Sequence, residues 1–224
     1  GLNMRLTLST NGTLIDKDVA KRIKDVGFSY VGISFDGIGE TNDRFRGMKG
    51  AFDLALNAVR NCMDVGQKVG LRLTLTKRNY EDLNGIFDFL EKEGIQRACF
   101  YHLVYAGRGS KISKDDLNHD ETRRAIDIIL DRTKDLHMRG IKKDILTVDN
   151  HVDGPYLYLR LKEKDPKRAE EIASLMRWNG GGTNSSGVGI GNIDPLGNVH
   201  PDQFWQHYTL GNVRKRSFSE IWMD

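Results

Sequence analysis

Four strand patterns alternate with helix patterns in the first half of the sequence, and this alternation limits the fold more than any other feature. The strand patterns are short apolar or alternating runs at 4–9, 30–35, 68–76 and 97–104. The helix patterns between them carry apolar residues at helical spacing and close on Gly27, Gly66 and Gly94. Strands that alternate with helices predict a parallel sheet with crossover helices, so we expect an α/β fold.

The second half of the sequence continues the alternation of strand and helix patterns only in part. A charged helix pattern at 119–139 precedes a fifth apolar run at 145–149. The later patterns are two short helices split at Asp165-Pro166, a polar glycine-rich stretch at 179–187, and a β-hairpin around Pro195-Leu196-Gly197. We therefore expect an α/β domain at 1–150 and a small extension that contains the hairpin at 151–224.

Composition excludes several classes of function. The chain has 34 Lys and Arg against 31 Asp and Glu, so its charge does not indicate a nucleic-acid partner. Its longest apolar run falls short of the roughly 18 residues that a membrane span needs. The two cysteines, Cys62 and Cys99, are predicted to be buried free thiols of a reducing compartment, with the cytoplasm as the expected location. Two cysteines cannot hold an iron–sulfur cluster of the four-thiolate kind.

The expected ends of the strands carry polar or glycine-rich sequences. These are STNG (9–12), SFDG (34–37), LTLTKRN (73–79) and HLVYAGRG (102–109). In α/β folds ligands bind at the carboxyl ends of parallel strands, so these loops are expected to form one site. The loop at 34–47 supplies hydroxyl and carboxylate acceptors for a ribose and an arginine for a carboxylate. A plain Asn-Gly turn and a solvated loop with a local Asp–Arg pair are the alternatives.

Three of these stretches resemble a known family. The sequence LSTNGTLID, then SFDGIGETNDRFRG, then LTLT followed by Asn, resembles the later part of a radical S-adenosylmethionine domain in enzymes with a SPASM or twitch-type extension. The ending, from RWNGGGTNSSG to SFSEIW, resembles the radical S-adenosylmethionine enzymes of heme and d1-type heme biosynthesis. The resemblance covers nearly the whole chain, and it implies part of a six-stranded (βα) partial TIM barrel.

The resemblance also implies roles for single residues around S-adenosylmethionine. Thr10 and Asn11 would lie beside the adenosyl group, and Ser34 and Arg46 would hold the ribose or the methionyl carboxylate. Asp36 would shape its loop or accept a ribose hydroxyl. Leu73 or Leu75 would pack against the adenine.

The chain departs from the family at the cluster. The CxxxCxxC loop that binds the 4Fe-4S cluster, and the glycine-rich motif for the methionine amine, are both absent from the sequence. The resemblance places both upstream of residue 1, on two further strands, so the missing N-terminal part of the same protein is an expected partner. The full-length protein is expected to be an oxidoreductase or decarboxylase that acts on propionate side chains of an iron tetrapyrrole. The chain alone is expected to be inactive.

An anionic tetrapyrrole needs cations, a wide apolar slot and an axial ligand. The candidate substrate residues are Arg72, His102, Arg108, Arg177, His200, Trp205 and His207. Each isolated histidine also fits a packing or surface role. In the hairpin, Asn192 and Asp202 occupy the places where SPASM-type extensions carry cluster cysteines, so no metal ligand is expected in this chain.

Four other functions stay open. These are a cluster-free module that binds a tetrapyrrole or a partner, a peptide-modifying SPASM enzyme, an acid/base TIM-type enzyme that uses Asp36 and His102, and a metal hydrolase built on His200, Asp202 and His207.

Overall fold

The computed structural model describes residues 4–178 and 186–224. The chain divides into two compact units, Gly1–Asp153 and Gly154–Asp224. The glycine-rich stretch at 179–187 lies almost wholly outside the described residues. No helix in the described ranges is long and apolar enough to cross a membrane.

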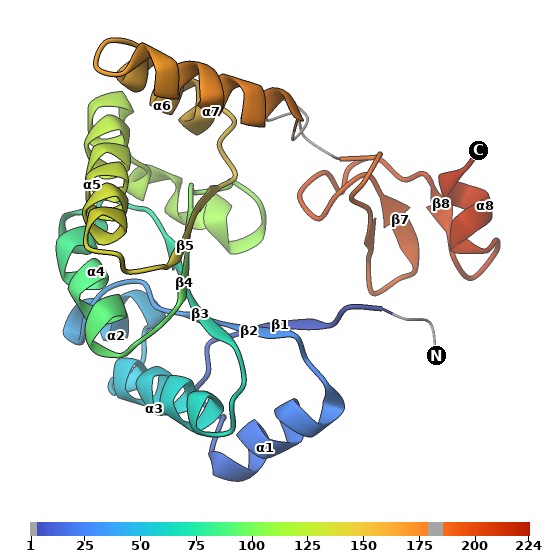
Figure 1. Cartoon of the computed structure of the whole chain (residues 1–224). Helices are drawn as coiled ribbons and strands as arrows, with labels where there is room; N and C mark the ends of the chain where they lie inside the picture. Colours follow the sequence, from blue (N-terminus) through green and yellow to red (C-terminus); the bar gives the residue numbers. More distant parts are fainter. Residues whose placement is uncertain (1–3, 179–185) are drawn as a thin grey trace. The chain divides into compact units, whose positions relative to one another are not determined.

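The first unit is built on a five-stranded parallel sheet in the order β1-β2-β3-β4-β5. Its strands are β1 (Thr7–Thr10), β2 (Tyr30–Ser34), β3 (Val69–Thr74), β4 (Arg97–Tyr101) and β5 (Asp144–Val148). The crossover segments are α1 (Lys17–Val26), α2 (Glu40–Arg46), α3 (Ala51–Asp64), η1 (Tyr80–Asp82), α4 (Leu83–Lys92), η2 (Gly107–Asp115) and α5 (His119–Met138). Figure 1 shows the curved sheet with α3, α4 and α5 along one face. The expected α/β fold and partial-barrel topology are confirmed.

Alternation along the strands separates the core from the open face of the sheet. Ile33, Leu71 and Leu73 are fully buried, and they belong to the set of side chains that faces the helices. The intervening residues Ser34 and Arg72 are neighbours in register on β2 and β3 and are only partly buried. The apolar side chains on one face of the sheet therefore pack against the helices, and the side chains on the opposite face are available to a ligand.

Local signals in the sequence set the helix ends. The Asp16 carboxylate accepts from the Val19 amide at 2.8 Å and caps α1, which ends at Gly27 in the left-handed conformation. Asn118 and Glu121 form a capping box at the start of α5. Asn79 precedes η1, but its side chain does not cap that helix. Its buried side chain accepts from the Thr76 amide and donates to the carbonyls of Asp36 and Thr74.

The second unit has a helical part and a β part. Its helices α6 (Asp153–Lys162) and α7 (Pro166–Trp178) are separated at Asp165, as the proline predicts. The expected hairpin is formed by β6 (Asn192–Ile193) and β7 (Asn198–His200). A third strand, β8 (Gly211–Asn212), and the short helix α8 (Phe218–Trp222) complete it. Neither was predicted, because a two-residue strand and a five-residue helix leave no periodic pattern. Ile221 of α8 packs directly over Gly211.

Candidate active site

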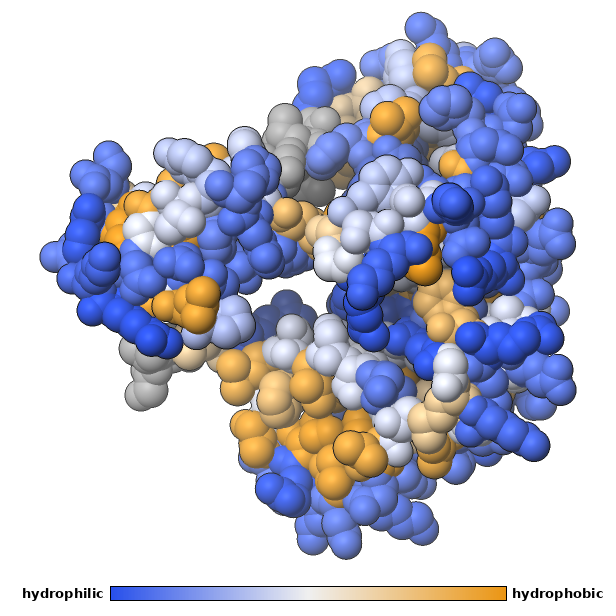
Figure 2. Space-filling model, turned by 180° about the vertical axis from the view of Figure 1, so that it is seen from behind, coloured by the Kyte–Doolittle hydropathy of each residue, from blue (hydrophilic) through white to orange (hydrophobic). Residues whose placement is uncertain are grey.

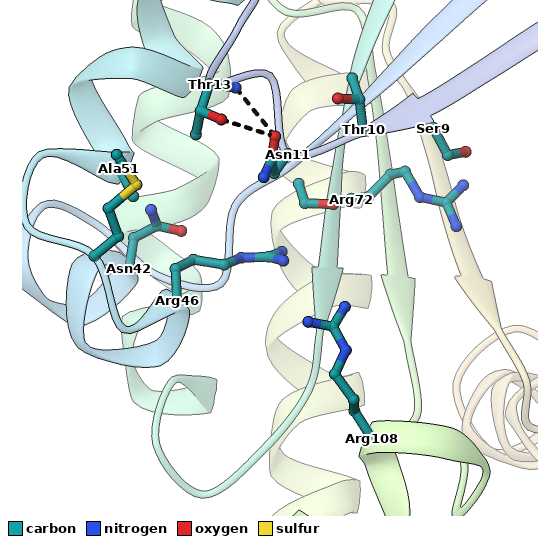
Figure 3. A pocket seen from close by; sticks show the side chains of 11 residues that line it. Ser9, Thr10, Asn11, Thr13, Asn42, Arg46, Ala51, Arg72 and Arg108 are labelled. Atoms are coloured by element: carbon teal, nitrogen blue, oxygen red, sulfur yellow. Dashed lines mark hydrogen bonds between the residues drawn. The ribbon is translucent and has the colours of Figure 1, made fainter.

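A polar cavity of about 420 Å³ lies at the carboxyl ends of β1, β2 and β3. It is lined by Ser9, Thr10, Asn11, Thr13, Ser34, Asn42, Arg46, Met48, Ala51, Arg72 and Arg108. Four of the residues expected at the cofactor, namely Thr10, Asn11, Ser34 and Arg46, meet here, as do two of the expected substrate residues, Arg72 and Arg108. Figure 3 shows Thr10, Asn11, Arg46 and Arg108 around a common space, while the Arg72 guanidinium extends from β3 toward Ser9.

The loop after β1 brings two polar side chains to the cavity. The Thr10 hydroxyl accepts from the Gly12 amide at 3.0 Å, and the Asn11 side-chain oxygen accepts from the Thr13 amide at 3.2 Å. Gly12 has a φ of +77°, and a Cβ there would lie 2.9 Å from Ile33 Cγ2. Only glycine allows the chain to turn this tightly against β2, so the Asn11-Gly12 pair is both a turn and a wall of the cavity.

The loop after β2 is held together by its own side chains. It was predicted as a plain loop, but it contains the helix α2. The Asp36 amide donates to the Asn42 side-chain oxygen at 2.9 Å, and the Asp43 carboxylate accepts from the amides of Gly50 and Phe52. These amides lower the pKa of Asp43. The loop therefore presents its arginine from a fixed frame.

Asp36 positions that arginine. Its carboxylate is 2% exposed, pairs with the Arg46 guanidinium and accepts from the Thr74 amide. Burial raises the pKa of Asp36, and Arg46 and the Thr74 amide lower it by less. A contact between Asp36 and a ribose is therefore not supported, because the carboxylate is buried and already paired. Its other expected role, shaping the loop, matches this geometry.

Two further guanidinium groups reach the cavity without an acidic partner. Among the described residues, neither Arg72 nor Arg108 forms an ion pair. The Arg72 guanidinium lies 4.4 Å from the centre of the Tyr101 ring. Arg108 extends from η2, and in Figure 3 its guanidinium and that of Arg46 point into the same space. The site therefore has more positive charge than its own carboxylates neutralise.

Several predicted contacts are not supported. Leu73 and Leu75 are fully buried on the core side and do not line the cavity, so a role in packing the adenine is not supported. His200 is 3% exposed, and its ring bonds to the Tyr208 carbonyl at 2.7 Å and faces Asp194 at 3.4 Å. It is a packing residue of the hairpin, because both of its nitrogens already have partners.

The remaining candidates lie elsewhere. His102 follows β4, and its Nε2 lies 2.9 Å from the Asp153 carboxylate. Arg177 is on α7, and Trp205 and His207 contact each other on the exposed loop between β7 and β8. His102 does not line the cavity, and the other three residues belong to the second unit. Sequence reasoning assigned no role to Ser9, Thr13, Asn42, Met48 and Ala51. Ser9 and Asn42 have a readable signal, because Ser9 begins the strand-end sequence STNG and Asn42 lies within the polar loop that supplies Arg46.

The donor set of the cavity fits a zwitterionic nucleoside but not an iron–sulfur cluster. Hydroxyl, amide and guanidinium groups match a ribose and a carboxylate. Cys62 and Cys99 are buried on α3 and β4, where burial raises the pKa of both thiols. In residues 4–178 and 186–224 no group of His, Cys, Asp and Glu could hold a metal ion. This also removes support for a hydrolase built on His200, Asp202 and His207.

Comparisons with known proteins agree with the fold and with the family resemblance of the sequence. Residues 1–90 match the model of the Radical SAM superfamily. The Fe-coproporphyrin III synthase of Methanosarcina barkeri is 59% identical over 221 residues, which cover 99% of this chain and 55% of that protein. The pre-heme d1 synthase of Dinoroseobacter shibae is 44% identical over 222 residues, covering 97% of this chain and 54% of that protein. The chain thus spans about half the length of these relatives.

Solved structures share the fold at low identity. The Streptococcus suis protein SuiB aligns with a TM-score of 0.74 and 18% identity, over 100% of this chain and 50% of that one. The protein anSMEcpe with bound AdoMet and the Kp18Cys peptide aligns with a TM-score of 0.71 and 19% identity, over 99% of this chain and 57% of that one. Residues 1–90 are thus similar to the radical SAM superfamily, and nearly the whole chain is similar to the Fe-coproporphyrin III synthase and the pre-heme d1 synthase.

Proposed function

We propose that this protein is a radical S-adenosylmethionine enzyme that acts on carboxylate side chains of an iron tetrapyrrole in heme or d1-type heme biosynthesis. The observation that carries the proposal is the cavity in which Thr10, Asn11, Ser34 and Arg46 converge. The printed names of the relatives, Fe-coproporphyrin III synthase and pre-heme d1 synthase, support the substrate class.

The residues of the chain bind and orient the cofactor in this proposal. Arg46, held by the buried Asp36, pairs with the methionyl carboxylate. Ser34 and the polar turn at Thr10 and Asn11 offer acceptors and donors to the ribose and the adenosyl group. Bound S-adenosylmethionine supplies the group that removes a hydrogen atom from the substrate. The cluster that activates it needs ligands from outside this sequence, since the chain has two cysteines and both are buried.

The two units have different roles in the proposal. The first unit, with the cavity, forms part of the cofactor-binding barrel. We assign the second unit, 151–224 in the sequence-based division and Gly154–Asp224 in the structure, as a SPASM or twitch-like extension. In its described residues no group of His, Cys, Asp and Glu could hold a metal ion.

The test uses a full-length form with a reconstituted cluster. The enzyme is incubated with S-adenosylmethionine, a reductant and iron tetrapyrroles, and products are separated by mass. We expect 5′-deoxyadenosine together with a tetrapyrrole that has lost mass from its carboxylate side chains. Turnover of a peptide instead, with tetrapyrroles unchanged, would favour the peptide-modifying alternative.

The cofactor site is tested by Arg46→Gln. We expect the affinity for S-adenosylmethionine to fall by about tenfold or more, because a hydrogen bond to a charged group contributes about 1.5–3 kcal/mol. Arg44→Gln is the matched control: it lies on the same helix, but its side chain is 75% exposed and pairs only with Glu40 at 3.8 Å. Equal affinities in the two variants would contradict the assignment of Arg46.

A further inference from the structure

The positive charge of the cavity exceeds what the cofactor needs. Three guanidinium groups line it, and within the part of the chain that the structure describes only that of Arg46 forms an ion pair with a carboxylate. S-adenosylmethionine brings one carboxylate together with an ammonium and a sulfonium group, so its own net charge is positive. Binding it leaves Arg72 and Arg108 uncompensated. Guanidinium groups that line one cavity without an anion give it a positive potential, so the site suits a second, anionic occupant.

Arg72 is held in place from two sides. Its guanidinium stacks over the Tyr101 ring at 4.4 Å, and burial raises the pKa of Tyr101 to about 12, so the ring stays neutral. Its aliphatic stem crosses β2 over Gly32, where a Cβ would lie 2.6 Å from Arg72 Cδ. Gly32 on β2 and Tyr101 on β4 therefore fix the direction of the Arg72 side chain, which starts on β3.

The surroundings of Arg72 leave its charge available. Burial raises the pKa of Asp149, and His102 and Arg72 lower it by less, which places Asp149 within electrostatic reach. Asp149 and Arg72 do not form an ion pair. The fork of Arg72 is thus preorganised but not neutralised, which suits a carboxylate that arrives with a ligand.

We propose that Arg72 and Arg108 form a clamp for a substrate carboxylate in this cavity, distinct from the cofactor role of Arg46. Arg72 is the rigid half, fixed by Gly32 and Tyr101. Arg108 is the exposed half, carried by the 3-10 segment η2. The clamp deepens the proposed function, and its assignment to a tetrapyrrole rests on that function. It makes the negative charge of the substrate's carboxylate side chains a determinant of specificity.

The first experiment compares two ligands that differ only in charge. Iron-coproporphyrin III and its tetramethyl ester are titrated in the same detergent buffer, and binding is followed by the Soret band. Arg72→Gln and Arg108→Gln are each expected to weaken binding of the acid about tenfold and to leave binding of the ester unchanged. Their affinity for S-adenosylmethionine should stay at the wild-type value, whereas Arg46→Gln should lose it.

Gly32→Ala tests whether the position of the Arg72 guanidinium matters as well as its charge. It keeps the Arg72 guanidinium but requires its stem to move, so the acid should bind as weakly as in Arg72→Gln. Arg44→Gln removes an exposed cation and should change nothing. Wild-type affinity for the acid in both Arg72→Gln and Arg108→Gln would overturn the clamp. A loss of S-adenosylmethionine affinity in Arg72→Gln would overturn it too, because Arg72 would then serve the cofactor.

A second probe separates this inference from the proposed function. Citrate presents several carboxylates without a macrocycle, and its binding is measured by calorimetry. If no tetrapyrrole binds but citrate binds and is lost in the Arg72→Gln, Arg108→Gln double variant, the clamp stands and the tetrapyrrole assignment fails. If citrate binding survives in the double variant or is absent from the wild type, and no tetrapyrrole binds, both fail.

Discussion

Single glycines decide whether the chain can approach itself closely at the site. Gly12 turns the chain under Ile33, and Gly32 makes room for the stem of Arg72. In each case the sequence shows the glycine, but the atoms that leave no room for a Cβ belong to another strand. A glycine that is required only by its positive φ is different, because a residue that replaces it is strained in its own backbone.

Gly12→Ala and Gly27→Ala form a matched pair that separates these two effects. Both positions have positive φ, +77° and +88°, but only at Gly12 would a Cβ meet other atoms. We expect Gly27→Ala to lower the free energy of unfolding by about 1 kcal/mol through backbone strain. Gly12→Ala should cost about 1–3 kcal/mol more, because the methyl group overpacks the core. Urea unfolding measures both, and equal losses would show that the close approach to Ile33 is not limiting.

At the scale of elements, the helix and hairpin ends are stabilised by side chains close in sequence. The capping box at α5 and the turn between β6 and β7 each satisfy backbone amides locally. Such contacts can be read from the sequence because both partners lie within a few residues of each other. The Asn79 network could not be read in this way, since its amide donates to the Asp36 carbonyl 43 residues away.

Asn118→Ala removes the cap of the longest helix. The side chain accepts from the amides of Asp120 and Glu121 at 3.0 and 2.9 Å. We expect a loss of about 1 kcal/mol in the free energy of unfolding, measured by urea. Asn118→Ser keeps a capping oxygen and should fall within a few tenths of a kcal/mol of the wild type. A loss in Asn118→Ser as large as in the alanine variant would argue against capping as the cause.

We expect acid to destabilise the turn between β6 and β7. The Asn198 side chain, followed by the Asn198 amide and His200, holds the pKa of Asp194 at about 2, below its ordinary value of 3.8. Since the folded pKa is lower, the stabilisation is complete above about pH 4 and is lost as the pH falls toward 2. Carbon-detected NMR of the Asp194 carboxyl should give this pKa, and Asn198→Ala should raise it. A midpoint near 3.8 in the wild type would contradict the hydrogen bonds of the turn.

At the scale of the whole molecule, the site and the cluster chemistry are separable. The residues that line the cavity all belong to the first unit, whereas the cysteine ligands of a cluster are absent from the sequence. In the proposed function, the contacts to S-adenosylmethionine come from this chain and the cluster ligands come from outside its sequence.

Reconstituting this 224-residue chain with iron, sulfide, reductant and S-adenosylmethionine should yield no 5′-deoxyadenosine. Its two cysteines are buried on different elements, α3 and β4, and cannot supply three thiolates to one cluster. Chromatography of the quenched reaction is the measurement, with a radical SAM enzyme that carries the three-cysteine loop treated in parallel. Product formed by the chain alone would refute this prediction.

The sequence by itself determined the order of strands and helices, the parallel sheet and the edge of the sheet where the polar cavity lies. These follow from periodicity and from helix-end signals, which act over a few residues. Only the tertiary structure decided what individual side chains do: that Asp36 is buried against Arg46, that Leu75 faces the core, and that His200 is part of the hairpin interior. Burial and pairing depend on residues distant in sequence, so a polar residue at a strand end can be placed at the site from the sequence, but its partner cannot.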